Sequence, residues 1–243
     1  MASLHIAAAK GRPVATADTR LIGVPGAMAG LFPDGGIRRG STVVIGPSSG
    51  GSSVALALVA AVTGSGAWAA AVGLPSLGLA AAAELGVRLE RLALVPYPGD
   101  QWTVAAAALL DGVDLLLLGP PARAGAGDAR RLAARARERG VVMVVLDGGG
   151  PAGAFGWPES PDFRLAVVRS AWDGLGVGYG HLRARRVEVA LSGRRAAVRE
   201  RRQLLWLPGP GGEMAPADEA VPAGEAVPAD EGVPVSKAAA LVG

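Results

Sequence analysis

A short stretch near residue 50 limits what this chain can fold into more than any other. Residues 41–45, STVVI, are small, β-branched and apolar, which is typical of a short buried strand. The next eight residues, GPSSGGSS, predict a glycine-rich turn, and residues 54–62, VALALVAAV, continue as an apolar helix. A strand that turns directly into a helix is the building unit of α/β folds. The stretch therefore predicts an α/β domain in which this turn follows the carboxyl end of a strand.

The same turn matches a phosphate-binding loop with one substitution. The P-loop pattern G-x-x-x-x-G-K-[ST] joins two glycines, a lysine and a hydroxyl at the start of a helix. Gly46 and Gly51 hold the glycine positions, Ser53 holds the hydroxyl position, and Ser52 stands where the lysine belongs. Backbone N–H groups at the start of the helix could still attract phosphate. The alternative is that the loop is only a tight turn that the fold needs, and the residues leave both interpretations open.

The remaining segments predict a mostly parallel sheet with helices on both faces. Strands that alternate with helices and read as continuous apolar runs indicate such a sheet. Gly86 is suited to end a helix in a left-handed conformation, and Asp100 and Asp128 are candidate N-caps. Further strands are predicted over residues 67–72, 89–95, 113–118 and 141–146, and helices over 75–85, 100–110 and 128–139. Strands without intervening helices, over 163–168, 186–191 and about 196–207, predict an antiparallel C-terminal flank.

Length and charge suggest one domain with two appendages. We expect an N-terminal segment over residues 1–25, an α/β domain over 26–207, and a disordered acidic Pro/Ala-rich tail over 208–243. The tail holds six acidic residues and one lysine, so its charge is −5 and the rest of the chain carries +8. Of the 24 basic residues, 22 are arginine, whose planar charged group suits phosphate and carboxylate partners.

The composition also excludes several kinds of chemistry. The chain has no cysteine and 2 histidines, which excludes disulfides, cysteine-based redox or metal chemistry and a histidine-rich metal cluster. We find no apolar run that would span a bilayer and no secretory signal pattern. The expectation is a cytoplasmic protein with no metal, no cofactor and no membrane partner.

Two arginine-rich segments are candidates for contacts with DNA or with an acidic partner. Arg131, Arg135 and Arg139 recur every four residues, so they share one face of a helix, which could equally be a plain solvated face. The segment 183–202 holds eight arginines, among them Arg185, Arg186, Arg194 and Arg195. This segment is predicted to form a basic hairpin, which could contact a DNA backbone without sequence preference or bind the acidic tail of its own chain. It lacks an aromatic ladder for stacking single-stranded bases, which weakens the DNA interpretation.

Three other residues were considered as functional candidates. Trp157 and Trp172 lie in segments predicted as Gly/Pro-rich loops, so we expect them to be exposed, and Trp172 is the candidate anchor for a protein partner. Asp147 follows the strand over 141–146, at the end of an α/β sheet where ligands bind. Because it has no nucleophile or metal ligand beside it, we expect it to cap the following turn.

Several stretches resemble the RecA family in order and spacing. LFPDGGIRRGSTVVIGPSSGGSSVALALVAA resembles the RecA P-loop region, and GVDLLLLGP resembles its Walker B strand. The resemblance covers roughly residues 26–205 and implies a RecA-like P-loop core. It departs from the family at three places: Ser52 replaces the lysine, Gly119 replaces the Walker B acid, and residues 73–76, GLPS, hold no catalytic glutamate. Because phosphoryl transfer depends on these charged groups, the resemblance implies a pseudo-ATPase.

Among RecA relatives with degenerate motifs, the chain most resembles the ImuA/ImuA′ group. This resemblance implies a catalytically inactive accessory protein that acts by protein contacts in SOS-induced translesion DNA synthesis and DNA repair. The implied partners are an ImuB-like relative of Y-family polymerases and either RecA or an error-prone C-family polymerase subunit, with DNA contact left open. Two alternatives remain: a RecA-like recombinase paralogue that retains ATP and DNA binding, and a SulA-like cell-division inhibitor.

Overall fold

The computed structural model of the chain describes residues 20–121, 124–147, 157–176, 179–196 and 200–218. Nine strands in these ranges form one mixed sheet in the order β11-β10-β9-β8-β3-β7-β6-β4-β5. The strands from β8 to β5 pair in parallel, and β8 to β11 pair antiparallel. The prediction of an α/β fold with a mostly parallel sheet and an antiparallel C-terminal flank is confirmed.

The parallel strands are short and apolar, and all except the edge strand β5 are largely buried. They are β3 (Thr42–Ile45), β4 (Ala69–Val72), β5 (Leu92–Val95), β6 (Leu115–Leu118) and β7 (Val142–Leu146). All four residues of β3, β4 and β6 are buried, as expected for strands that are covered on both faces. The glycine-rich turn follows β3, which lies between β7 and β8 near the middle of the sheet.

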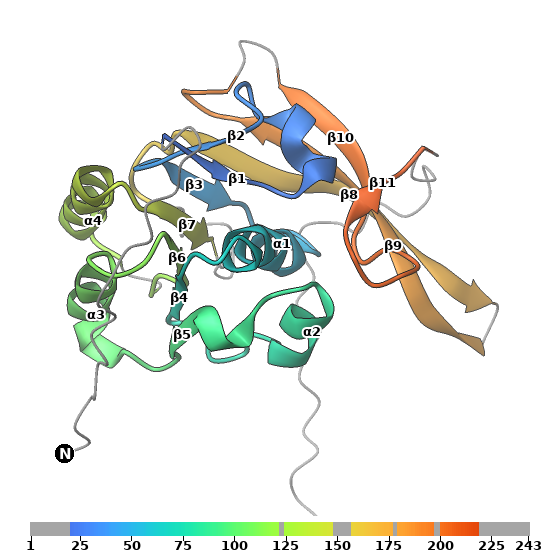
Figure 1. The fold of residues 1–243 in the computed structure, drawn as a ribbon, viewed down its shortest axis with the longest axis horizontal. Coiled ribbons are helices and arrows are strands. Elements are labelled where there is room, and N and C mark those ends of the chain that lie inside the picture. The colour runs from blue at the N-terminus through green and yellow to red at the C-terminus, as the bar shows by residue number, and fades with distance from the viewer. Residues whose placement is uncertain (1–19, 122–123, 148–156, 177–178, 197–199, 219–243) are drawn as a thin grey trace, which may run out of the picture.

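Helices cover both faces of the sheet (Figure 1). On one face lies α1 (Gly51–Gly64), and on the other lie α3 (Trp102–Leu109) and α4 (Ala126–Arg139). Alternate strand residues point to the two cores: Val43 and Ile45 pack with α1, whereas Val44 packs with α3 and α4. The chain also forms α2 (Leu79–Glu84) and the 3₁₀ helices η1 (Gly26–Leu31), η2 (Leu89–Arg91) and η3 (Gly99–Gln101).

Both predicted N-caps are wrong, for a similar reason. Because η3 begins at Gly99, Asp100 lies inside that turn and Gln101 is the N-cap residue of α3. Because α4 begins at Ala126, Asp128 lies in its first turn and Gly125 precedes the helix. In the first turn Asp128 still favours the helix electrostatically. The prediction for Gly86 is confirmed, since its φ is 90° directly after α2.

The N-terminal boundary differs from the predicted one. β1 (Leu21–Gly23) pairs antiparallel with β2 (Gly36–Arg38), and Ile22 is buried against the core under α1. The ordered domain therefore starts earlier than residue 26. The predicted N-terminal segment otherwise lies outside the described residues.

The antiparallel flank is longer than predicted. β8 (Phe163–Gly176) and β9 (Tyr179–Ser192) pair as a long hairpin, parts of which extend away from the body in Figure 1. β10 (Arg201–Trp206) pairs with β9, and β11 (Ala215–Pro216) pairs with β10. The start of the expected disordered tail is thus part of the sheet, while residues 219–243 lie outside the described residues.

The two tryptophans expected in exposed loops are placed differently. Trp157 is buried at 5% exposure in the core beneath α3 and α4, so its predicted exposure is wrong. Trp172 is half-buried within β8, and the guanidinium of Arg185 lies 5.1 Å from its ring centre. Arg185 therefore covers one face of the ring, and the role of Trp172 as an anchor for a protein partner stays a prediction.

Candidate functional site

The glycine-rich loop connects β3 to α1 with the geometry of a tight strand-to-helix turn. The Gly46 N–H donates to the carbonyl of Leu165 on β8 at 2.9 Å, which attaches the start of the loop to the next strand. Gly50 precedes α1 with a φ of 108°, a conformation that favours glycine. The Gly51 N–H donates to the Ser48 carbonyl at 3.1 Å, and this bond closes the turn.

Two backbone donors at the start of α1 have no partner among the described residues. The first four N–H groups of any helix lack acceptors within the helix. Here the Gly51 N–H is bonded as above, and the Val54 N–H donates to the Gly50 carbonyl at 3.1 Å. In the described part of the chain the N–H groups of Ser52 and Ser53 find no acceptor. Ser52 is exposed and Ser53 is half-buried, so solvent reaches this end of the helix.

Arg185 of β9 lies against the same loop, which we did not predict from sequence. Its side chain is 4% exposed, and a Cβ atom on Gly50 would collide with its Nη2 and lie 2.8 Å from its Cζ. Its Nε donates to the Leu207 carbonyl at 3.1 Å, whereas its buried Nη2 has no partner. Burial lowers the pKa of Arg185. The expectation that Arg185 belongs to an exposed basic surface is therefore wrong.

Strand alternation could have revealed this burial. Arg185 has the same parity along β9 as Val187 and Val189, which both lie in the core under α1. Side chains two residues apart in a strand point to the same face. The sequence thus puts Arg185 on the apolar face, although it does not identify the loop that this arginine meets.

The carboxyl ends of β4 and β6 are packed directly against each other. The Gly119 N–H donates to the Val72 carbonyl at 2.9 Å. A Cβ atom on Gly119 would lie 2.5 Å from Cδ2 of Leu74 and 2.6 Å from the Gly73 carbonyl oxygen. Gly73 has a φ of 73°, and a Cβ atom there would collide with the Gly119 carbonyl. Neither position has room for a carboxylate side chain without a backbone shift.

Asp147 is the buried carboxylate at this end of the sheet. Its N–H donates to the Ile45 carbonyl at 3.0 Å, which sets it beside the start of the loop. Burial raises its pKa, while a hydrogen bond from the Trp157 backbone N–H and the charge of Arg164 act in the opposite direction. Its predicted role as a cap of the following turn involves residues 148–156, which lie outside the described part.

The three α4 arginines predicted as a contact face, Arg131, Arg135 and Arg139, are paired with carboxylates. Arg135 and Arg139 both contact Asp111, at 2.6 Å and 2.9 Å, and Arg131 contacts Asp128. The hydrogen bond from Arg135 is the largest cause that lowers the pKa of Asp111, and the charge of Arg139 acts in the same direction. These ion pairs are exposed, and they reduce the positive charge that the helix presents.

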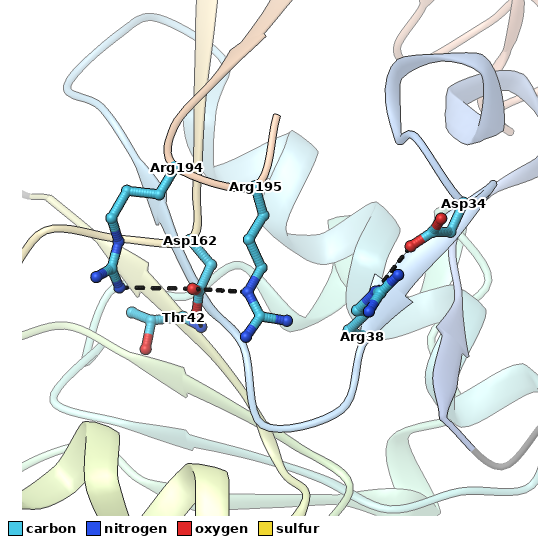
Figure 2. Close-up of polar contacts among 6 residues, drawn as sticks. All are labelled: Asp34, Arg38, Thr42, Asp162, Arg194 and Arg195. Carbon is cyan, nitrogen blue, oxygen red and sulfur yellow. Dashed lines mark hydrogen bonds and ion pairs between the residues drawn. The ribbon is translucent and has the colours of Figure 1, made fainter. Parts of the chain in front are cut away.

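The turn between β9 and β10 uses its arginines in a similar way (Figure 2). Arg194 and Arg195 lie on either side of the buried carboxylate of Asp162, at 3.5 Å and 3.1 Å. The other oxygen of Asp162 accepts the Thr42 N–H at 3.0 Å, so the turn is attached to the start of β3. Arg186 is also mostly buried, pairs with Asp173 at 3.1 Å and lies 5.5 Å from the Trp206 ring centre.

A basic cavity of about 710 Å³ lies at the opposite end of the parallel strands from the glycine-rich loop. Three of its four arginines pair with carboxylates: Arg38 with Asp34, Arg39 with Asp114, and Arg195 with Asp162. The cavity is lined by Arg20, Leu21, Asp34, Arg38, Arg39, Gly140 and Arg195.

No group of three or more potential metal-ligating side chains occurs in the described ranges. Within the same ranges, none of the helices has the length and apolar character needed to cross a membrane.

The fold and loop define an α/β protein with a mostly parallel sheet and a glycine-rich strand-to-helix turn that lacks the P-loop lysine. The chain belongs to the MT3502 N-terminal domain family, whose model matches residues 30–159. It is also similar to the uncharacterized protein Rv3395c of Mycobacterium tuberculosis (strain ATCC 25618 / H37Rv). The two are 41% identical over 138 residues, which cover 56% of this chain and 67% of the relative. The family match contains the loop and ends before β8, so Arg185 lies outside it.

Proposed function

We propose that this chain is a catalytically inactive, RecA-like accessory protein that acts by protein–protein contacts in SOS-induced translesion DNA synthesis and DNA repair. The proposal combines the resemblance to the ImuA/ImuA′ group with the geometry of the loop end of the sheet. Its partners are an ImuB-like relative of Y-family polymerases and either RecA or an error-prone C-family polymerase subunit.

The observation that carries the inactive part of the proposal is the contact between Gly73 and Gly119. In an active relative, acidic residues near these positions hold Mg²⁺ and activate water. Here each glycine fills the space that a side chain on the other would need. With Ser52 in the lysine position, the three charged groups are missing together and two of their positions are sterically closed.

The order of elements supports the RecA-like part of the proposal. A turn at Pro33–Gly36 leads through Arg38 and Arg39 into β3, the glycine-rich loop and α1, in the order that carried the resemblance. The strand at the Walker B position, β6, is fully buried and is separated from β3 by one strand, β7. The antiparallel flank continues the sheet from β8.

An exposed apolar edge supports action through protein contacts. β5 ends the described sheet, so one side of this strand has no pairing partner among the described strands. Leu89, Leu94 and Tyr97 expose 41%, 42% and 81% of their surface along this edge. An unpaired edge with apolar side chains is a typical site for docking another chain.

The first experiment tests whether the loop can be made catalytic. We expect neither the wild-type chain nor Ser52→Lys to hydrolyse ATP, because the lysine alone does not supply the missing carboxylates. Ser52→Ala is the matched control for the loss of the serine. Measurable ATP turnover by Ser52→Lys would contradict the inactive assignment.

The second experiment tests the partner. The full chain is used as bait against the Y-family polymerase relative, the C-family polymerase subunit and the polymer-forming cell-division protein. We expect capture of a translesion component and its loss in Tyr97→Glu, while Val168→Glu, an exposed residue on β8, retains binding. Capture of the division protein alone would favour the SulA-like alternative, and Mg²⁺-dependent ATP binding would favour the recombinase paralogue.

A further inference from the structure

We propose that the glycine-rich loop binds one phosphate group, and that Arg185 of β9 supplies the positive charge which the loop itself lacks. The site would consist of the Arg185 Nη2 and the N–H groups of Ser52 and Ser53. It takes a single oxyanion, as free orthophosphate or as the terminal phosphate of a nucleotide. This inference rests on the loop geometry and does not depend on the proposed role in translesion synthesis.

The first argument is the unpaired state of Arg185. A buried guanidinium normally pairs with an acid, because an uncompensated charge away from water is unfavourable. The Nη2 of Arg185 is buried without a hydrogen-bond partner, and no carboxylate pairs with this arginine in the described part of the chain. The face of the guanidinium covers Trp172, and its Nε is occupied by the Leu207 carbonyl, so the side chain is held in place with Nη2 at Gly50.

The second argument is the charge of the helix terminus that Arg185 approaches. The N-terminus of a helix acts as about half a positive charge. Gly50 precedes α1, so the buried guanidinium and the positive end of a 14-residue helix face one another. Two positive groups at close range are unfavourable unless an anion lies between them. A phosphate group would satisfy both, and the two free N–H groups of the first turn are donors suited to it.

The third argument is the fit between β9 and the loop. Two constraints favour glycine at position 50: its φ of 108° disfavours other residues, and a Cβ atom there would collide with Arg185. The loop therefore leaves room for this guanidinium. Ser52 is exposed and Ser53 is half-buried, so an anion can reach their N–H groups from solvent, and it would contact the buried Nη2 after a small shift of the guanidinium.

The arrangement predicts how the ligand binds. One guanidinium and two N–H groups match the oxygens of one phosphate group. The acid that would hold a metal beside a triphosphate is missing at Gly119, and no catalytic glutamate stands at residues 73–76. We therefore expect orthophosphate and ATP to bind with affinities within about tenfold of each other and without dependence on Mg²⁺.

The test is isothermal titration calorimetry of the full chain with orthophosphate and with ATP, each with and without Mg²⁺, at constant ionic strength. Arg185→Met keeps the apolar stem and removes the charge, and we expect it to weaken binding by about tenfold or more. Arg183→Met is the matched control, because Arg183 is exposed on the same strand, and it should bind like the wild type.

Ser52→Asp tests the site even if Arg185→Met fails to fold. An acidic residue in the first turn stabilises a helix and repels phosphate from its N-terminus. We expect this variant to retain the wild-type melting temperature or exceed it and to lose phosphate binding. The proposal is overturned if the wild type shows no saturable phosphate binding, if Ser52→Asp binds as the wild type does, or if Arg183→Met loses as much as Arg185→Met. Binding of Mg²⁺–ATP more than about a hundredfold tighter than orthophosphate would also overturn it.

Discussion

Gly119 offers the sharpest test of how the loop end of the sheet is closed. Gly119→Asp restores an acid at the Walker B position, and Gly119→Ala adds the Cβ atom alone. In either variant the new Cβ would lie 2.5 Å from Cδ2 of Leu74 and 2.6 Å from the Gly73 carbonyl oxygen. Carbon atoms in good contact are about 3.5–4.0 Å apart, so the strand ends must separate by about 1 Å. The obstacle includes backbone, so a side-chain rotation cannot remove it.

The magnitude follows from this overlap. Forcing an extra carbon into a packed site costs about 2 kcal/mol of folding free energy, so Gly119→Ala should lower the melting temperature by roughly 4–8 °C. An aspartate adds the unfavourable placement of a charge beside a carbonyl oxygen, and we expect its total cost to be about 4 kcal/mol. The corresponding fall in melting temperature is roughly 8–16 °C.

The assay is thermal unfolding followed by circular dichroism, with Gly112→Ala as the control. A Cβ atom on Gly112 would meet no atom within 4 Å, so this variant reports only the effect of replacing glycine. We expect it to melt within about 2 °C of the wild type. If Gly119→Asp proved as stable as Gly112→Ala, the end of the sheet would be open to an acid and the steric argument for inactivity would be refuted.

Three further predictions concern the loop and two carboxylates. Gly50→Ala should destabilise the chain more than Gly66→Ala in chemical denaturation, because both glycines have a positive φ but only Gly50 meets Arg185. The difference between the two losses should shrink in an Arg185→Met background. Equal losses in stability for the two variants would contradict the contact with Arg185. The pKa of Asp111 is lowered from 3.8, so its ion pairs with Arg135 and Arg139 stabilise the fold above that pH. Asp111→Asn should therefore melt at a slightly lower temperature than the wild type at pH 7. This difference in melting temperature should vanish as the pH falls below 3.8. Burial raises the pKa of Asp147 from 3.8, so its charged form opposes folding. Asp147→Asn should therefore melt at a higher temperature than the wild type at pH 7. If this gain in melting temperature did not shrink as the pH fell toward 3.8, burial of the charge would not be its cause.

The parallel half of the fold follows from local sequence. Residues 41–45 and 113–118 are apolar runs of strand length, and each is bounded by glycine or by a charged residue. Such segments become buried strands wherever they fall in a sheet, and the glycine-rich turn had to connect a strand to a helix. Their boundaries moved by only one or two residues in the structure.

The flank was harder to predict because its strands are stabilised by pairing with distant segments. The residues around Trp172 resemble a loop in composition, yet they pair with β9 across a hairpin. Residues 215–216 were expected to belong to the disordered tail, but they form β11 and pair with β10. In both cases long-range hydrogen bonds and burial outweighed weak local propensity.

Some features of the candidate site could likewise be predicted from the sequence, and others depended on the tertiary structure. The sequence alone determined that the loop lacks its lysine and that Gly119 replaces an acid, because these are identities at fixed spacing. Strand parity relates Arg185 to Val187 and Val189, but the strand predicted from sequence began at residue 186, so the burial of Arg185 was not predicted. Only the tertiary structure decided that this arginine meets Gly50, since the contact joins residues 135 positions apart in the chain. Which side chain lies against a loop depends on the order and register of the strands, and those are set by packing over the whole sheet.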